Sequence, residues 1–236
     1  MPLRPGDGAR TLADVALAEL REAIVSGEIP PGSPIRLQEY VDRLSMSTVP
    51  IREALRFLEQ KGLIERRPHR GVVVCEMSAT DLEDTYKIRL DLESMAVRMA
   101  VPRIKEKDRI LLLGLVDEYE AALRADNGTA PDVHTKLHMS IYEYANSRWL
   151  RLLLPSLWDN SERYRRLQIP VRGTIEQRVE EHRLLVEACA SGDPEVAATE
   201  LQAHLSRTMV GAIALLREQE GNEAIAADLA AGASGS

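Results

Sequence analysis

The stretch Ser47–Cys75, STVPIREALRFLEQKGLIERRPHRGVVVC, decides the fold of the first part of this chain. Its apolar residues follow the spacing of an amphipathic helix up to about Lys61. A hydroxyl at Ser47 or Thr48 can cap the first turn, where a proline is tolerated. Gly62 then ends the helix, because glycine favours the position that follows a helix C-terminus.

Two short segments, at 63–67 and 71–75, follow that glycine, and with the Pro-His-Arg stretch between them they predict the two strands of a β-hairpin. Upstream, helical spacing indicates one helix over 12–26 and a shorter one over 37–44. The order helix, short helix, turn, helix and hairpin is typical of a winged helix-turn-helix, which we place at residues 10–76. A small α+β domain without a nucleic-acid role is the alternative.

The distribution of charge favours the DNA-binding interpretation. The chain has 236 residues and a formal net charge of −7. Residues 47–70 nevertheless hold six basic residues against three acidic ones. A basic patch on an acidic protein fits contacts with phosphates, whereas a solvated helix face is the plainer interpretation.

Beyond Met77 the pattern is helical to about residue 219 and has none of the alternation that is typical of strands. We therefore expect an all-α antiparallel helical bundle over residues 78–219 and a mainly α fold class. The Ala-rich tail, residues 220–236, is low in complexity and is predicted to be disordered.

Two further observations bear on location. No apolar run approaches the roughly 20 residues that cross a bilayer, so no membrane partner is expected. Cys75 and Cys189 lie far apart, without a C-x-x-C spacing. We expect them to be buried thiols of a cytoplasmic protein.

Four of the five histidines fall in the helical part of the chain. His134 and His138 share a helix face because they are four residues apart, and His182 and His204 lie on two later helical segments. If the four imidazoles converge, they form a site for a divalent metal ion. Such a set favours Zn, Ni or Cu over metals that prefer oxygen, so we expect Zn, with Ni as the alternative. Direct hydrogen bonding to an organic ligand, without metal, is the other interpretation.

The pair His134 and His138 also has the spacing of a zinc-protease helix. That motif needs a glutamate directly after the first histidine as general base, and Thr135 cannot take this role. We therefore expect no enzymatic activity. A metal-dependent hydrolase with a vestigial DNA-binding head is the competing hypothesis.

Three linked motifs carry a resemblance to a known family. They are Leu44–Leu55 with Leu58-Glu59 and Gly62–Ile64; Arg89 with Leu92-Glu93 and Leu137-His138 through Ala145-Asn146; and Glu181-His182 through Gly192-Asp193 to His204-Leu205. The first resembles the signature of GntR-type transcription regulators. The other two resemble the helical ligand-binding FCD domain of the FadR-like branch. The resemblance covers roughly residues 12–216.

The resemblance implies a homodimer whose two heads read a pseudo-palindromic double-stranded DNA operator, with one helix in the major groove and the wing in an adjacent groove. Carried over by position, the DNA-binding residues are Arg36, Ser47, Thr48, Arg52, His69, Arg70 and Gly71. The family usually has Arg at 48, Thr at 49 and often Arg at 34, where this chain has Thr48, Val49 and Pro34. We therefore expect a different operator, with Arg36, Arg66 and Arg67 as compensating cations.

In the second domain, the resemblance implies metal ligands at His134, His138, His182 and His204, although the family has Asp at the first position. The extra imidazole makes the site more positive, which favours a small carboxylate effector. By resemblance Arg89 points into the cavity, and Arg163, Arg165 and Arg166 are further candidate cations. We expect a repressor in which effector and operator weaken each other's binding. The alternative is a metal-sensing regulator without an organic effector.

Overall fold

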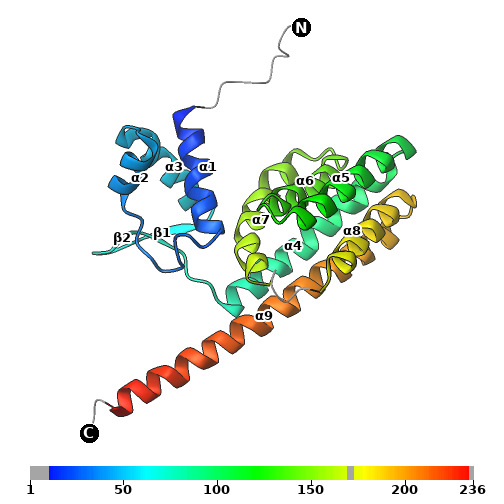
Figure 1. The fold of residues 1–236 in the computed structure, drawn as a ribbon. Helices are drawn as coiled ribbons and strands as arrows, with labels where there is room; N and C mark the ends of the chain where they lie inside the picture. Colours follow the sequence, from blue (N-terminus) through cyan, green and yellow to red (C-terminus); the bar gives the residue numbers. More distant parts are fainter. Residues whose placement is uncertain (1–10, 169–172, 234–236) are drawn as a thin grey trace. The chain divides into compact units, whose positions relative to one another are not determined.

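The computed structural model describes residues 11–168 and 173–233, which form two compact units that divide after Met77 (Figure 1). Each unit has its own core. The first contains α1 (Leu12–Val25), α2 (Leu37–Leu44), α3 (Thr48–Gln60), β1 (Ile64–Arg67) and β2 (Gly71–Val74).

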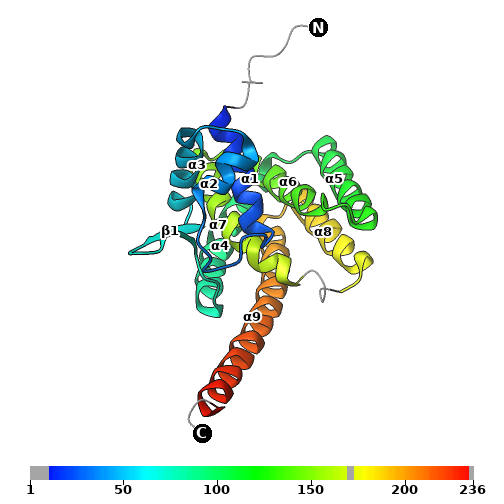
Figure 2. The ribbon, with the colours of Figure 1, turned by 60° about the vertical axis from the view of Figure 1, so that its left-hand side comes forward.

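The first unit is built around a core of aliphatic side chains. Leu20 of α1, Ile51 and Leu58 of α3, and Leu63 are all fully buried in one cluster. The three helices lie together beside the hairpin (Figure 2). Thr11 begins α1 with a capping box that supplies acceptors for otherwise unpaired backbone N–H groups. This arrangement confirms the winged helix-turn-helix.

The wing is a two-stranded antiparallel sheet in which Ile64 pairs with Val74 and Arg67 with Gly71. His69 at its tip has φ 63°, and Gly71 has φ 73°. Both residues therefore have the left-handed backbone conformation that a tight hairpin turn requires, which is uncommon for a residue other than glycine.

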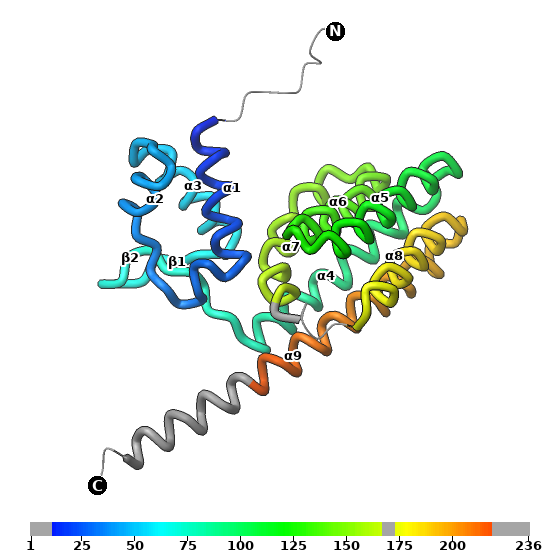
Figure 3. Tube along the Cα trace, viewed as in Figure 1, coloured from blue at the N-terminus to red at the C-terminus, as the bar shows by residue number. Residues whose placement is uncertain are grey.

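The second unit is all-helical. It contains α4 (Ala79–Ala100), the short 3₁₀ helix η1 (Val101–Arg103), α5 (Glu106–Ala125), α6 (Ala130–Glu143), α7 (Arg148–Gln168), α8 (Ile175–Ala190) and α9 (Pro194–Ala233). Helix α4 packs along α9, and α5 packs against both α6 and α8 (Figure 3). The helices are amphipathic and bury their apolar faces against each other, so the expected helical bundle is confirmed.

Helix α9 continues to Ala233, over residues for which the sequence predicts a disordered tail. Alanine, which is abundant in this segment, has the highest helix propensity. Disorder of residues 220–236 stays a prediction. The last three residues of the predicted tail lie outside the described part of the chain.

Within the described residues neither cysteine forms a disulfide, and the two differ in exposure. Cys189 is fully buried, and this burial raises the pKa of its thiol to about 12. Cys75, just after the wing, is only half-buried. The expectation of two buried thiols therefore fits Cys189 and not Cys75.

Among the described residues, no helix combines the length and the apolar character that spanning a membrane requires.

Candidate metal centre and nucleic-acid interface

Four histidines converge inside the second unit. His134 and His138 come from α6, His182 from α8 and His204 from α9. Each is at least 97 % buried, and one ligand atom from each lies within 4.8 Å of those of the others. The fifth histidine, His69, is exposed at the tip of the wing in the other unit. The structure thus brings together all the histidines that the sequence proposed as ligands.

Hydrogen bonds at Nδ1 fix the orientation of two of the four imidazole rings. Nδ1 of His182 lies 2.6 Å from the carbonyl oxygen of Arg178, to which it donates. Nδ1 of His138 lies 3.3 Å from the hydroxyl of Tyr142, which in turn donates to Glu93. A neutral ring with this contact has its lone pair on Nε2, and such outer partners fix the tautomer of metal-binding histidines.

His204 has an acidic neighbour that the sequence did not suggest. Its Nδ1 lies 3.4 Å from a carboxylate oxygen of Glu181 on α8. The other oxygen of Glu181 lies 3.2 Å from Arg207. The pair of Glu181 and His204 therefore joins α8 to α9 directly beside the cluster. Since Glu181 precedes His182 in sequence, its position next to a different histidine follows only from helix packing.

The donor set fits a metal ion in chemistry and in burial. The pKa of His138 is lowered well below its ordinary value, chiefly by burial and then by the charges of His204, His182, Arg89 and Arg165. The neutral imidazole that results is the form that binds metal. Tetrahedral Zn with bonds of about 2.0 Å places its nitrogens about 3.3 Å apart, so the widest pair here would have to close by up to about 1.5 Å.

A buried ion pair lies beside the cluster. Arg89 donates through Nε to Glu93 and through Nη1 to Ser161, at 2.5 and 2.8 Å, and its guanidinium lies 4.6 Å from the ring centre of Trp158. Glu93 also accepts from the indole of Trp158 at 3.1 Å and from Tyr142. Burial alone would lower the pKa of Arg89, but the charges of Glu93 and Tyr86 raise it above its ordinary value. Much of the charge of Arg89 is thus balanced by protein.

A cavity of about 10 Å³ adjoins the rings of His134, His138 and His204. Arg89 and Arg165 line it, which agrees with the direction expected for Arg89. Arg163 does not line it, although its side chain is also buried. Two residues along a helix correspond to about 200° of rotation, so 163 and 165 point to nearly opposite sides of α7.

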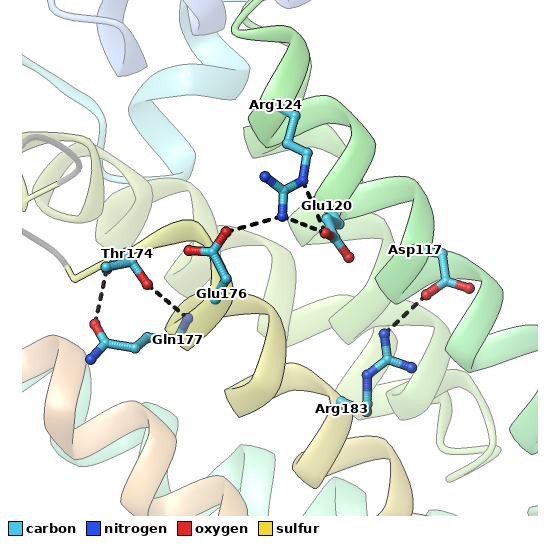
Figure 4. Close-up of polar contacts among 7 residues, drawn as sticks. All are labelled: Asp117, Glu120, Arg124, Thr174, Glu176, Gln177 and Arg183. Atoms are coloured by element: carbon cyan, nitrogen blue, oxygen red, sulfur yellow. Dashed lines mark hydrogen bonds and ion pairs between the residues drawn. The ribbon is translucent and has the colours of Figure 1, made fainter.

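Polar contacts between α5 and α8 fix the helix that carries His182 (Figure 4). Thr174 and Gln177 form a capping box at the start of α8. Between the two helices, Arg124 of α5 lies 3.0 Å from Glu176 in the first turn of α8, and Arg183 farther along α8 lies 3.1 Å from Asp117 of α5. These contacts restrict sliding of α8 along α5 and so help to fix the position of His182 along the axis of α8.

In the first unit, the residues proposed to bind DNA are exposed. Ser47, Thr48 and Arg52 lie at the start of α3, and the side chain of Ser47 makes no capping hydrogen bond although it stands at the N-cap. His69, Arg70 and Gly71 form the exposed wing tip. Within the described residues, Arg52 and Arg70 have no ion-pair partner.

The arginines expected to compensate for the missing basic residues are less available for contacts with DNA. Arg36 lies 3.1 Å from Glu39, Arg66 lies 3.1 Å from Glu59, and Arg67 lies 2.7 Å from Glu65. Each already has a carboxylate close by, which reduces what it can offer a phosphate. Arg56 belongs to the basic patch at 47–70 but not to the proposed DNA-binding residues, and it is exposed one turn after Arg52. Its spacing of four residues was the signal that could have identified it.

Comparison with known proteins agrees with this architecture. The FCD domain matches residues 84–207, and the gntR family of bacterial regulatory proteins matches residues 12–74. The chain therefore belongs to the GntR family and carries the FCD domain of its FadR-like branch. It is a DNA-binding transcription regulator and not an enzyme.

Two relatives match most of the chain. The uncharacterised HTH-type regulator YdhC of Bacillus subtilis is 28% identical over 192 residues, which cover 80% of this chain and 85% of YdhC. A probable D-xylose utilization operon transcriptional repressor of Paenarthrobacter nicotinovorans is 30% identical over 188 residues, which cover 78% of this chain and 80% of the relative. Among solved structures, E. coli McbR/YncC has a TM-score of 0.75 at 24% identity, over 89% of this chain and 99% of that chain, which shows a shared fold.

Proposed function

We propose that the protein is a homodimeric repressor whose second unit holds a divalent metal ion and responds to a small carboxylic acid. The observation that carries this proposal is the cluster of four buried histidines, with ligand atoms within 4.8 Å of one another. Repression is supported by relatives that are named as repressors, among them the P. nicotinovorans protein and E. coli GlaR.

In the proposed complex, α3 of each protomer enters the major groove of one operator half-site. Arg52 contacts a guanine or a phosphate, because its planar fork suits both. Thr48 supplies a shorter contact, and the wing tip at His69 and Arg70 reaches the neighbouring groove. The exposure of these side chains supports this assignment.

His134, His138, His182 and His204 would hold the ion, which we expect to be Zn, or else Ni, because neutral imidazoles suit both metals. When bound, the ion would supply a positive charge that favours binding of an anionic acid in the same domain. The protein's part is to present neutral rings. Tyr142 and the carbonyl of Arg178 keep the proton on Nδ1 of two of them.

Regulation follows from linkage between the two sites. If the acid binds better to an arrangement of the heads that fits the operator poorly, then acid and operator weaken each other by the same factor. Removal of the acid would restore operator binding. A repressor that controls genes for the use of its own effector needs this response.

Metal content of purified, untagged protein tests the proposal. Mass spectrometry should find about one Zn or Ni per chain, and His138→Asn should reduce it sharply. His69→Asn is the matched control: it removes the fifth histidine, from the exposed wing, and should leave metal content unchanged. Absence of metal from wild-type protein after incubation with Zn and Ni would refute the metal site.

A second candidate, a sensor in which the ion itself is the signal, is favoured by one observation. The cavity beside the rings measures only about 10 Å³, close to the space of one water molecule. The metal sensor would be favoured if operator affinity changed with free Zn in acid-free buffer and no acid altered it.

A further inference from the structure

The small size of the histidine cavity requires another place for the body of an organic effector. A second cavity, of about 160 Å³, lies next to it. Arg165 lines both cavities. Tyr119 lines the second, and its ring centre lies 5.5 Å from that of His134 and 4.9 Å from that of His182. The two cavities are thus neighbours on either side of shared side chains.

Arg178 provides an unusual group at the wall of this second cavity. Its Nε is buried and has no hydrogen-bond partner, and within the described residues the guanidinium has no ion-pair partner. Nearby arginines on the same pair of helices are different, since Arg124 and Arg183 both face carboxylates (Figure 4). A buried N–H without an acceptor is unfavourable, so Arg178 is suited to an acceptor that a ligand brings.

The charge of the cavity limits what that ligand can be. Arg165 pairs with Glu162, to which its Nε and Nη2 donate at 2.6 and 2.5 Å, and Glu162 also pairs with Arg166. Of the two arginines on the cavity, Arg178 is the one without an ion-pair partner among the described residues, while Asp126 lies on the same cavity. A second carboxylate on the ligand would be repelled by Asp126, so a monoanion fits best.

The remaining wall is small and apolar. It is formed by the side chains of Ala122, Leu123, Ala130 and Pro131. Such a wall suits a short hydrocarbon portion and has no room for a large ring. Arg178 also borders an open groove, but that groove is lined by Glu176, Glu180, Glu181 and Glu200 against one further cation, Arg207, so its carboxylates outnumber its cations and disfavour an acid.

We propose that the 160 Å³ cavity is the binding site of the effector and that its ligand is a short monocarboxylic acid. The carboxylate binds Arg178 and the hydrocarbon part lies against Ala122 and Leu123. Binding of the acid would affect the histidine cluster through Tyr119 and Arg165, which connect it to this cavity. Only this effect on regulation rests on the proposed function. Binding itself requires no operator.

Calorimetric titration of metal-loaded, full-length protein with propionate, butyrate, lactate and succinate tests this site. At least one monocarboxylate should bind, and more tightly than succinate. Arg178→Gln should weaken that binding by about 10-fold to 100-fold, the usual effect of losing a charge-assisted hydrogen bond. Arg178→Lys should retain part of the affinity. Arg183→Gln, on the same helix but facing Asp117, is the matched control and should leave acid binding unchanged.

A second variant tests the cavity independently of charge. Ala122→Leu places a larger side chain into the space and should abolish acid binding while helix content, measured by circular dichroism, is retained. Unchanged affinity in both Arg178→Gln and Ala122→Leu would overturn the proposal, and so would a wild-type protein that binds none of these monocarboxylates. Metal content and acid-free operator affinity, measured on the same samples, report separately on the proposed function.

Discussion

Glu93 is the residue that balances charge beside the histidine cluster. It is fully buried and accepts hydrogen bonds from Arg89, Tyr142 and Trp158. Burial, followed by the charge of Glu93, raises the pKa of Tyr142 well above its ordinary value, so the phenol stays protonated and keeps donating. One carboxylate therefore holds three side chains that surround His138.

Replacement of this carboxylate by an amide should be strongly destabilising. Glu93→Gln leaves the Arg89 guanidinium buried without a counter-charge, and breaking a buried pair in this way lowers the free energy of unfolding by about 3–5 kcal/mol. Urea denaturation of the full-length protein measures this loss in the free energy of unfolding. Glu195→Gln, which breaks the exposed pair with Arg98, is the control and should have no measurable effect. Similar small losses in the two variants would contradict the role of Glu93.

The exposed arginines of the head should differ in their effect on DNA binding. Arg52→Ala should weaken binding to an operator selected from random DNA by about 1–3 kcal/mol if the side chain contacts a base. Arg66→Ala should weaken it less, because Glu59 already lies beside Arg66. Fluorescence anisotropy measures both affinities. A larger loss for Arg66→Ala would place the main DNA contact on the wing strand instead of on α3.

At the scale of the element, α8 depends on its first turn. Thr174→Ala removes the hydroxyl that accepts from the backbone of Gln177 and should lower the free energy of unfolding by about 1 kcal/mol. Because α8 also carries His182, metal affinity measured by chelator competition should fall with it. Thr129→Ala is the control: this N-cap side chain makes no capping bond and donates only to the exposed Asn127 side chain, so neither quantity should change appreciably. Equal losses in the two variants would show that the cap at Thr174 has no special role.

Sequence was most informative where the determinants are local. The helix after Ser47, its end at Gly62 and the hairpin that follows depend on neighbours in the chain, and the structure contains all three. The sequence also indicated the histidine cluster, since His134 and His138 share one face of a helix. In contrast, Arg178 and Tyr119 become neighbours of the cluster only through packing of α5, α6 and α8. No spacing in the sequence predicts them.

For the molecule as a whole, charge is unequally shared between the two units. Residues up to Glu76 contain eleven basic and eleven acidic residues, so the whole net charge of −7 lies in the rest of the chain. An acidic helical unit is repelled by the DNA backbone, while the basic patch of the first unit is attracted to it. This asymmetry favours approach to DNA by the winged head.

The two cysteines give each unit one thiol of opposite reactivity. Because only the thiolate reacts, and the pKa of Cys189 is about 12, that thiol should be inert at neutral pH, whereas half-buried Cys75 should be open to reagents. A maleimide dye should therefore label one cysteine per native chain, counted by mass spectrometry, and two after denaturation. Labelling of Cys189 in the native protein would contradict this. The natural chain would then carry a single fluorescent reporter beside its wing, placed there by the fold without any mutation.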